Sequence, residues 1–232
     1  MSDAMPPSFA IILGAGSAGL TWARVADEVG AVVLPIPDEP NVRTMAARLQ
    51  PSIAELRPPR VLIAASAGAL VALEVARAVP VQALVLTAAG FGIEVSDRLL
   101  DWIAQYPPDL HAKMARICLA DRDDGASIEA IVADYEACGQ PVHLRQLRAL
   151  AAHRPEPLDD PPPTFVLWGM HDRAIPLASH IELARQCRGA LVPVADAAHV
   201  PHFEQSQLTI EWISKAAALA RSHHAAASTT QT

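Results

Sequence analysis

Short apolar runs alternate with helical patterns along most of this chain, and this alternation most constrains its fold. Six runs are too short for ordinary helices. Their apolar residues are consecutive rather than alternating, which is typical of strands buried on both faces. We therefore predict an α/β fold with a mostly parallel sheet and helices on both faces. The predicted strands are residues 9–13, 31–34, 61–64, 82–87, 164–168 and 191–194.

One long segment interrupts the alternation. Residues 93–162 contain no clear strand pattern, and several stretches within them have helical character. The segment ends in a proline-rich stretch, 155–163, which is stiff and marks the end of a subdomain. We therefore predict a core formed by 8–92 and 163–222, with a helical insertion at 93–162. The low-complexity residues 223–232 predict a disordered tail.

Composition narrows the class of protein. Of the 232 residues, 51% are hydrophobic, which predicts a folded globular chain. The formal net charge is -7 without a long basic run, so we expect neither nucleic acid nor an anionic membrane surface as a partner. No apolar run reaches the roughly 18 residues of a membrane span, and the start does not resemble a signal peptide. We expect a cytoplasmic protein; the sequence carries no signal of its oligomeric state.

Metal and disulfide chemistry are not predicted. No group of histidine, cysteine and acidic residues has the spacing of a metal site. The chain has an odd number of cysteines, and no two of them are close in sequence: Cys118, Cys138 and Cys187. We therefore expect inert thiols. We therefore predict no metal and no cofactor.

Three polar residues suited to nucleophilic catalysis follow predicted strands. Ser66, Asp172 and His199 come shortly after the third, fifth and sixth apolar runs, respectively. Because the carboxyl ends of parallel strands lie at one edge of a sheet, we expect the three side chains to lie close together. A serine hydroxyl is a weak nucleophile unless a histidine takes its proton and an acid orients that histidine. We therefore predict Ser66 as the nucleophile, His199 as the base and Asp172 as the orienting acid.

The neighbours of Ser66 are small, as a nucleophile on a sharp strand-to-helix turn requires. Ala64, Ala65, Ala67 and Gly68 surround it. The helix predicted to start after the serine favours developing negative charge at its N-terminus. The alternative is that Ser66 only caps this helix.

Other residues compete for two of these roles. His202, three residues after the predicted base, is the alternative base, although a packing or helix-capping role is favoured. Glu94 and Asp196 are alternative acids, and Asp172 has a helix-capping role as its own alternative. Glu204 is expected to serve the start of the final helix electrostatically.

The first predicted strand ends in a glycine-rich turn. Gly14, Gly16 and Gly19 match the G-x-G-x-x-G fingerprint of dinucleotide-binding proteins, between a strand and a helix. This fingerprint predicts a dinucleotide-dependent oxidoreductase. However, the next strand ends at Leu34-Pro35, so proline occupies the place of the acid that would bind a ribose. The fingerprint also leaves the serine, aspartate and histidine unexplained, and we keep it as the alternative from a different class.

In these motifs the chain resembles the α/β-hydrolase superfamily, and within it the small lid-bearing esterases, lactonases and C–C bond hydrolases. Segments 167–176 and 198–204 are similar to the acid and histidine segments of that superfamily, and 14–22 to its oxyanion turn. The resemblance implies the α/β-hydrolase fold with a minimal sheet of about six strands, because the superfamily's usual first two antiparallel strands have no counterpart here. It also implies that the insertion 93–162 is a lid.

The resemblance assigns further residues. It implies that the backbone N–H groups of Ala15 and Ala67 bind the oxyanion that acyl transfer creates. Gly14 would let the substrate approach the turn closely. The side chains expected to line an apolar acyl site are Phe91, Trp102, Tyr106 and Met114.

The chain also departs from the superfamily's pattern. Leu13 stands where histidine is frequent, and Ala64 replaces the first glycine of G-x-S-x-G. Neither change removes a group that the chemistry needs. Serine at position 66 argues against dehalogenases and epoxide hydrolases, which use aspartate there. We expect a carboxylic-ester hydrolase that acts on a small-molecule acyl substrate and forms an acyl-enzyme without a cofactor. A thioesterase, a lactonase or a C–C bond hydrolase could use the same three residues.

Overall fold

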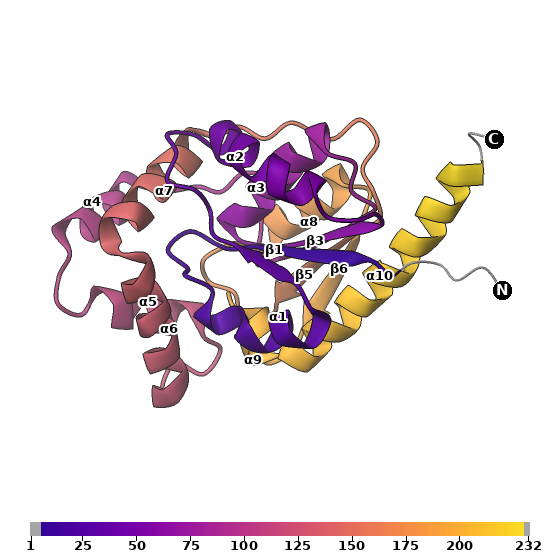
Figure 1. Ribbon diagram of the computed structural model, residues 1–232. Helices are drawn as coiled ribbons and strands as arrows, with labels where there is room; N and C mark the ends of the chain where they lie inside the picture. The colour runs from indigo at the N-terminus through magenta and orange to yellow at the C-terminus, as the bar shows by residue number, and fades with distance from the viewer. Residues whose placement is uncertain (1–5, 230–232) are drawn as a thin grey trace.

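The centre of the molecule is a six-stranded sheet in the order β2-β1-β3-β4-β5-β6, with every neighbouring pair parallel (Figure 1). The computed structural model describes residues 6–229, with side chains up to residue 225. Each strand lies within one residue of its predicted bounds, which confirms the predicted α/β fold. The strands are β1 (Ser8–Ile12), β2 (Val32–Leu34), β3 (Arg60–Ala65), β4 (Ala83–Thr87), β5 (Thr164–Gly169) and β6 (Ala190–Val194).

Helices cover both faces of the sheet, and the packing of residues 10–13, in β1 and directly after it, explains why this run is apolar. Ala10 and Ile12 belong to the core on one face, whereas Ile11 and Leu13 belong to the core on the other; all four are fully buried. The first face is covered by α2 (Val42–Ala54), α3 (Ala67–Ala78) and α8 (Leu177–Gln186), and the second by α1 (Ala23–Val29) and α10 (Ser206–Thr229) (Figure 1).

Four helices separate β4 from β5. They gather at one end of the sheet (Figure 1), where α6 and α7 contact the turn that follows β1. This is the end at which the parallel strands have their carboxyl termini. The helices are α4 (Asp97–Gln105), α5 (Leu110–Cys118), α6 (Gly125–Cys138) and α7 (Gln140–Ala152).

The C-terminal segment differs from its prediction. Residues 223–232 were expected to be disordered, but α10 continues to Thr229. Alanine has the highest helix propensity, and this alanine-rich segment extends a helix already anchored against the sheet. Residues 230–232 lie outside the described residues.

The sheet order places a crevice at the carboxyl end of β1. From β1 the chain moves to β2 on one side, and later enters β3 on the other side. The turns that leave β1 and β3 therefore diverge, which is where open α/β sheets bind ligands. The glycine turn follows β1 and Ser66 follows β3, so both lie at this crevice.

Candidate active site

Ser66 stands on a strained turn between β3 and α3. Its backbone has φ 49° and ψ -121°, a conformation that non-glycine residues rarely adopt. The Ser66 N–H donates to the Thr87 carbonyl oxygen at 2.9 Å, which ties the turn to β4. A Cβ on Gly68 would lie 2.2 Å from the Leu13 carbonyl oxygen, so only glycine fits there. The turn thus presents the serine hydroxyl outward from the sheet.

The structure brings the three predicted residues into hydrogen-bonding distance. His199 Nε2 is 3.2 Å from Ser66 Oγ. On its other side, His199 Nδ1 is 3.0 Å from Asp172 Oδ2 and 3.2 Å from Oδ1. Because a carboxylate only accepts, Nδ1 carries the proton in this arrangement, and Nε2 is free to accept the serine proton. The His199 N–H donates to the Cys118 carbonyl oxygen at 2.9 Å, so the insertion helps to hold the histidine loop.

Asp172 is held as a fully buried carboxylate. Its Oδ1 accepts the backbone N–H groups of Ala174 and Ile175 at 2.8 and 3.0 Å. Burial by itself raises the pKa of this carboxyl, but the charge and hydrogen bond of His199 and the two N–H groups outweigh it, so the net pKa is lowered. Asp172 is therefore ionised and oriented toward His199 at neutral pH.

A second buried histidine lies behind this carboxylate. His180 Nδ1 is 3.2 Å from the Pro176 carbonyl oxygen, so this nitrogen carries the proton. Its Nε2 lies 3.7 Å from Asp172 Oδ2 and has no hydrogen bond. Burial lowers the pKa of His180, which keeps the ring neutral. Sequence reasoning missed this residue, because it lies within α8 and no local pattern sets it apart.

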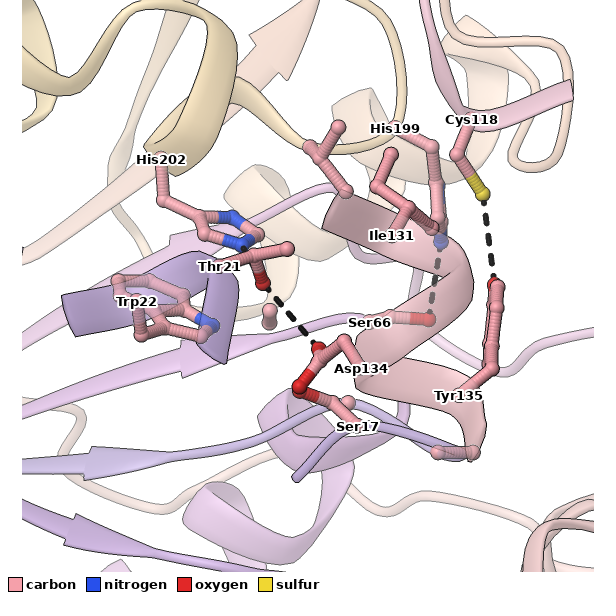
Figure 2. A pocket seen from close by; sticks show the side chains of 14 residues that line it. Ser17, Thr21, Trp22, Ser66, Cys118, Ile131, Asp134, Tyr135, His199 and His202 are labelled. Carbon is pink, nitrogen blue, oxygen red and sulfur yellow. Dashed lines mark hydrogen bonds between the residues drawn. The ribbon is translucent and has the colours of Figure 1, made fainter. Parts of the chain in front are cut away.

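The competing residues are not part of this chain of hydrogen bonds. His202 is stacked on Trp22 with ring centroids 3.8 Å apart, and its Nε2 is 3.4 Å from the Thr21 hydroxyl, consistent with its favoured packing role (Figure 2). Glu94 and Asp196 are exposed, and neither forms a hydrogen bond with His199. The geometry favours His199 and Asp172 for these roles.

The buried His202 makes stability depend on pH. Burial lowers its pKa to about 3, so between about pH 6.5 and 3 the unfolded chain binds a proton that the folded chain excludes. Unfolding therefore becomes easier as the pH falls through this range. His202→Phe keeps an aromatic ring on Trp22 but has no proton to bind. As the pH falls from 6 to 4, we expect the unfolding free energy of this variant to decrease less steeply than that of the wild type, by about 1.4 kcal/mol per pH unit. Urea unfolding at several pH values measures this slope, and equal slopes in both proteins would contradict the assignment.

Glu204 has a different role from the predicted one. Its two carboxylate oxygens accept the N–H groups of Ala198 and Ala120, each at 2.7 Å. It therefore joins the histidine loop to the segment between α5 and α6, rather than acting only on its own helix. Burial raises the pKa of this carboxyl, although the two N–H groups oppose the shift. The partner in the insertion could not be found from sequence spacing.

Two cavities flank Ser66 and share part of their lining. The larger, of about 210 Å³, lies under α4, α5 and α7. The smaller, of about 70 Å³, contains polar groups and includes Gly14, Trp22 and Asp134 (Figure 2). Ser66 and His199 line both. The apolar side chains of the larger cavity are Ile93, Val95, Leu99, Trp102, Met114, Ile117, Leu147, Leu150 and Ile175.

The side chains predicted for the acyl site lie in different surroundings. Trp102 and Met114 line the larger cavity. Phe91 lines neither cavity; it packs into the core beside the sheet, and its N–H donates to the Ser179 carbonyl oxygen. Tyr106 is 51% exposed and packs edge-on against His111 instead. Phe91 and Tyr106 therefore do not line the cavities beside Ser66, because the sequence places each residue along the chain without fixing which way its side chain points.

The glycine turn and the start of α3 each leave one backbone N–H group free to donate a hydrogen bond to a ligand. Within the described residues, neither the Ala15 N–H nor the Ala67 N–H has a hydrogen-bond acceptor. In contrast, the N–H groups of Ala18 and Leu20 donate to the Asp134 carboxylate at 3.0 and 2.8 Å. A pyrophosphate would need such N–H groups and would meet a carboxylate there, which disfavours the dinucleotide alternative.

The described residues form neither a metal site nor a membrane-spanning helix. Within residues 6–229, no three His, Cys, Asp or Glu side chains are grouped so that they could hold a metal ion. No helix in the same range combines the length and apolar character that a membrane crossing requires.

The fold and this site define the class of protein: an α/β protein with a serine, a histidine and an aspartate at the carboxyl edge of a parallel sheet. A sequence model of the alpha/beta hydrolase family matches residues 7–212, and the chain belongs to this family. No curated protein matches the chain in sequence.

Solved structures share the fold. A thermophilic esterase has a TM-score of 0.77 at 21% identity, covering 90% of this chain and 88% of its own. The enol-lactonase from Burkholderia xenovorans has a TM-score of 0.77 at 16% identity, covering 91% of each chain. The 2-hydroxy-6-oxo-6-phenylhexa-2,4-dienoate hydrolase from Rhodococcus has a TM-score of 0.72 at 16% identity, covering 92% of this chain and 91% of its own. At these identities the similarity is one of fold.

Proposed function

We propose that this protein is a serine hydrolase that cleaves carboxylic esters through an acyl-enzyme. The observation that carries the proposal is the chain of hydrogen bonds from Asp172 through His199 to Ser66, which ends at an apolar cavity. This arrangement supplies a nucleophile, a base and an orienting acid in one line.

The first half of the reaction acylates the serine. His199 Nε2 takes the proton of Ser66 Oγ while that oxygen attacks the ester carbonyl carbon. The carbonyl oxygen becomes negative and accepts hydrogen bonds from the free N–H groups of Ala15 and Ala67. The tetrahedral intermediate then collapses, and His199 gives its proton to the leaving alkoxide oxygen. The products of this half are the free alcohol and an ester on Ser66.

The second half releases the acid by the same groups. Water replaces the alcohol, and His199 Nε2 takes its proton as the water oxygen attacks the acyl carbon. Collapse of the second intermediate breaks the bond to Ser66 Oγ, which regains its proton from His199. Asp172 stabilises the imidazolium in both halves and keeps the proton on Nδ1 between them.

The lining of the cavities favours a neutral acyl group. Neither cavity has a lysine or arginine among its lining residues in the described part of the chain, whereas Glu94 and Asp134 bring carboxylates. A substrate carboxylate would therefore be buried without a partner, at a high cost in free energy. The named substrate of the Rhodococcus C–C bond hydrolase is such a carboxylate, so the lining favours an ester over that chemistry. We further propose that α4–α7 act as the lid over this acyl site; thioesters and lactones need the same groups and remain alternatives.

A matched pair of esters tests the proposal. The p-nitrophenyl ester of hexanoic acid and the mono-p-nitrophenyl ester of hexanedioic acid have equal chain lengths and differ by a terminal carboxylate. We expect hydrolysis of the first, with a burst of p-nitrophenol from acyl-enzyme formation, and at least about tenfold lower kcat/KM for the second. Hydrolysis of neither ester would contradict the function, and a preference for the acid would contradict the neutral acyl group.

A further inference from the structure

Side chains of the insertion hold the glycine turn that carries Ala15. Asp134 on α6 accepts four hydrogen bonds from residues 17–21 of that turn and the short helix after it. Its Oδ1 accepts hydrogen bonds from the N–H groups of Ala18 and Leu20, at 3.0 and 2.8 Å. Its Oδ2 accepts hydrogen bonds from the hydroxyls of Ser17 and Thr21, at 2.7 and 3.3 Å (Figure 2).

The Asp134 carboxylate is buried, and its hydrogen-bond donors are all uncharged, which is unusual for a buried charge. Asp134 is 5% exposed, and no lysine, arginine or histidine forms an ion pair with it in the described part of the chain. Its charge is compensated by N–H and O–H donors from a single five-residue segment. A buried carboxylate strongly favours a state in which all its donors are present, so it resists any movement of that segment.

A second side chain of the insertion holds the turn from the other side. Gln146 on α7 accepts the Gly16 N–H at 2.9 Å and donates to the Ile36 carbonyl oxygen at 2.9 Å. Gln146 is 4% exposed, so water does not compete for these bonds. His143 on the same helix packs on Gly16, where an added Cβ would lie 2.8 Å from its ring. The second glycine of the fingerprint is thus required by the packing of α7.

We propose that Asp134 and Gln146 are positioning residues that fix the Ala15 N–H beside Ser66, so that the insertion forms part of the oxyanion site. The inference rests on the proposed function, because it concerns a donor to the reacting oxygen. Ala15 lies between Gly14 and Gly16, and glycine is the residue with the greatest backbone freedom. Without Asp134 and Gln146, the segment after Ala15 loses the bonds that hold it, and its N–H group samples other directions.

The same contacts restrict how the insertion can move. If α6 and α7 lifted away as a rigid cover, the turn would lose its bonds to Asp134 and Gln146 together. Substrate access is therefore expected beside α4 and α5, where the cavity-lining residues Glu94 and Ile117 are exposed.

The test compares two aspartates of the same helix. Asp134→Ala removes the acceptor of the turn, whereas Asp124→Ala removes the N-cap of α6, whose side chain accepts the Ser127 N–H, and touches nothing in the turn. We expect Asp134→Ala to lower kcat on p-nitrophenyl hexanoate about 10²-fold with a much smaller change in KM, because a misplaced oxyanion donor acts on the transition state. Asp124→Ala should stay within about threefold of wild type. Asp134→Asn, which keeps one carbonyl oxygen for the N–H groups, should recover part of the loss.

Hydrogen exchange provides a readout besides activity. We expect the amides of residues 14–20 to exchange faster in Asp134→Ala and in Gln146→Leu than in wild type and Asp124→Ala. If Asp134→Ala folds poorly, Asp134→Asn and Gln146→Leu carry the same comparison. Asp134 and Gln146 variants with wild-type kcat and unchanged exchange at the turn would overturn the inference while the function stands. Absence of Ser66-dependent turnover in the wild-type protein would instead overturn the function, and this inference with it.

Discussion

Replacing Ser66 with alanine should abolish ester hydrolysis, with kcat lowered about 10⁴- to 10⁶-fold. In the proposed mechanism this hydroxyl attacks the substrate, and the alanine variant has no group to replace it, because His199 Nε2 would face a methyl group. Folding should be nearly unaffected, because the substitution removes one hydrogen bond of 3.2 Å and leaves the backbone of the turn unchanged. Steady-state hydrolysis of p-nitrophenyl hexanoate and thermal unfolding measure the two effects.

A serine distant from the site provides the control. Ser222 lies on α10, where its hydroxyl donates to the Ala218 carbonyl oxygen at 3.3 Å. Ser222→Ala should keep wild-type activity. If Ser66→Ala retained more than about a tenth of wild-type kcat, the assignment of the nucleophile would be wrong.

Asp172→Asn should lower kcat about 10⁴-fold, although asparagine has the same shape as aspartate. The asparagine carbonyl oxygen must take the place of Oδ1, which accepts the N–H groups of Ala174 and Ile175. The amide NH2 then lies where Oδ2 was, 3.0 Å from His199 Nδ1. An NH2 group donates, so Nδ1 must accept and the ring proton moves to Nε2. His199 then presents a proton to Ser66 and cannot accept one.

The pattern of loss separates this tautomer effect from a general loss of structure. Asp172→Asn should leave KM close to wild type and the protein folded, because both backbone hydrogen bonds remain. The exposed Asp160→Asn variant, in the linker before β5, should behave as wild type. A kcat within tenfold of wild type for Asp172→Asn would show that another acid orients His199.

The sequence predicted those parts of the site whose signal is local. Ser66, Asp172 and His199 each follow an apolar strand, and parallel strands bring their carboxyl ends to one edge, so their proximity follows from the order of the elements. Small residues around Ser66 carried further information, since Gly68 is required by the closeness of the Leu13 carbonyl oxygen.

The remaining parts depend on contacts between elements distant in sequence. Asp134 and Gln146 meet the glycine turn across more than 100 residues, and Glu204 meets Ala120 across 84. Nothing in their local sequence distinguishes them from other polar residues of helices. Phe91 illustrates a related point: its position after β4 follows from the sequence, but the direction of its side chain is decided by packing against the core.

The glycine fingerprint shows how one local pattern can serve two purposes. Glycines between a strand and a helix suit a pyrophosphate, and here they also suit a turn packed under α6 and α7. What distinguishes the two cases is the partner of the N–H groups, which is the buried carboxylate of Asp134. A partner 114 residues away cannot be deduced from the motif.

The most direct test of the central claim is labelling of the native protein with a fluorophosphonate probe, followed by peptide mapping. The probe loses fluoride and forms a covalent bond only with a serine oxygen that a working base activates. We expect a single labelled residue, Ser66, with labelling lost after heat denaturation and in His199→Ala. A native protein that remains unlabelled, or is labelled at another serine, would contradict the assembly of Ser66, His199 and Asp172 into a catalytic site.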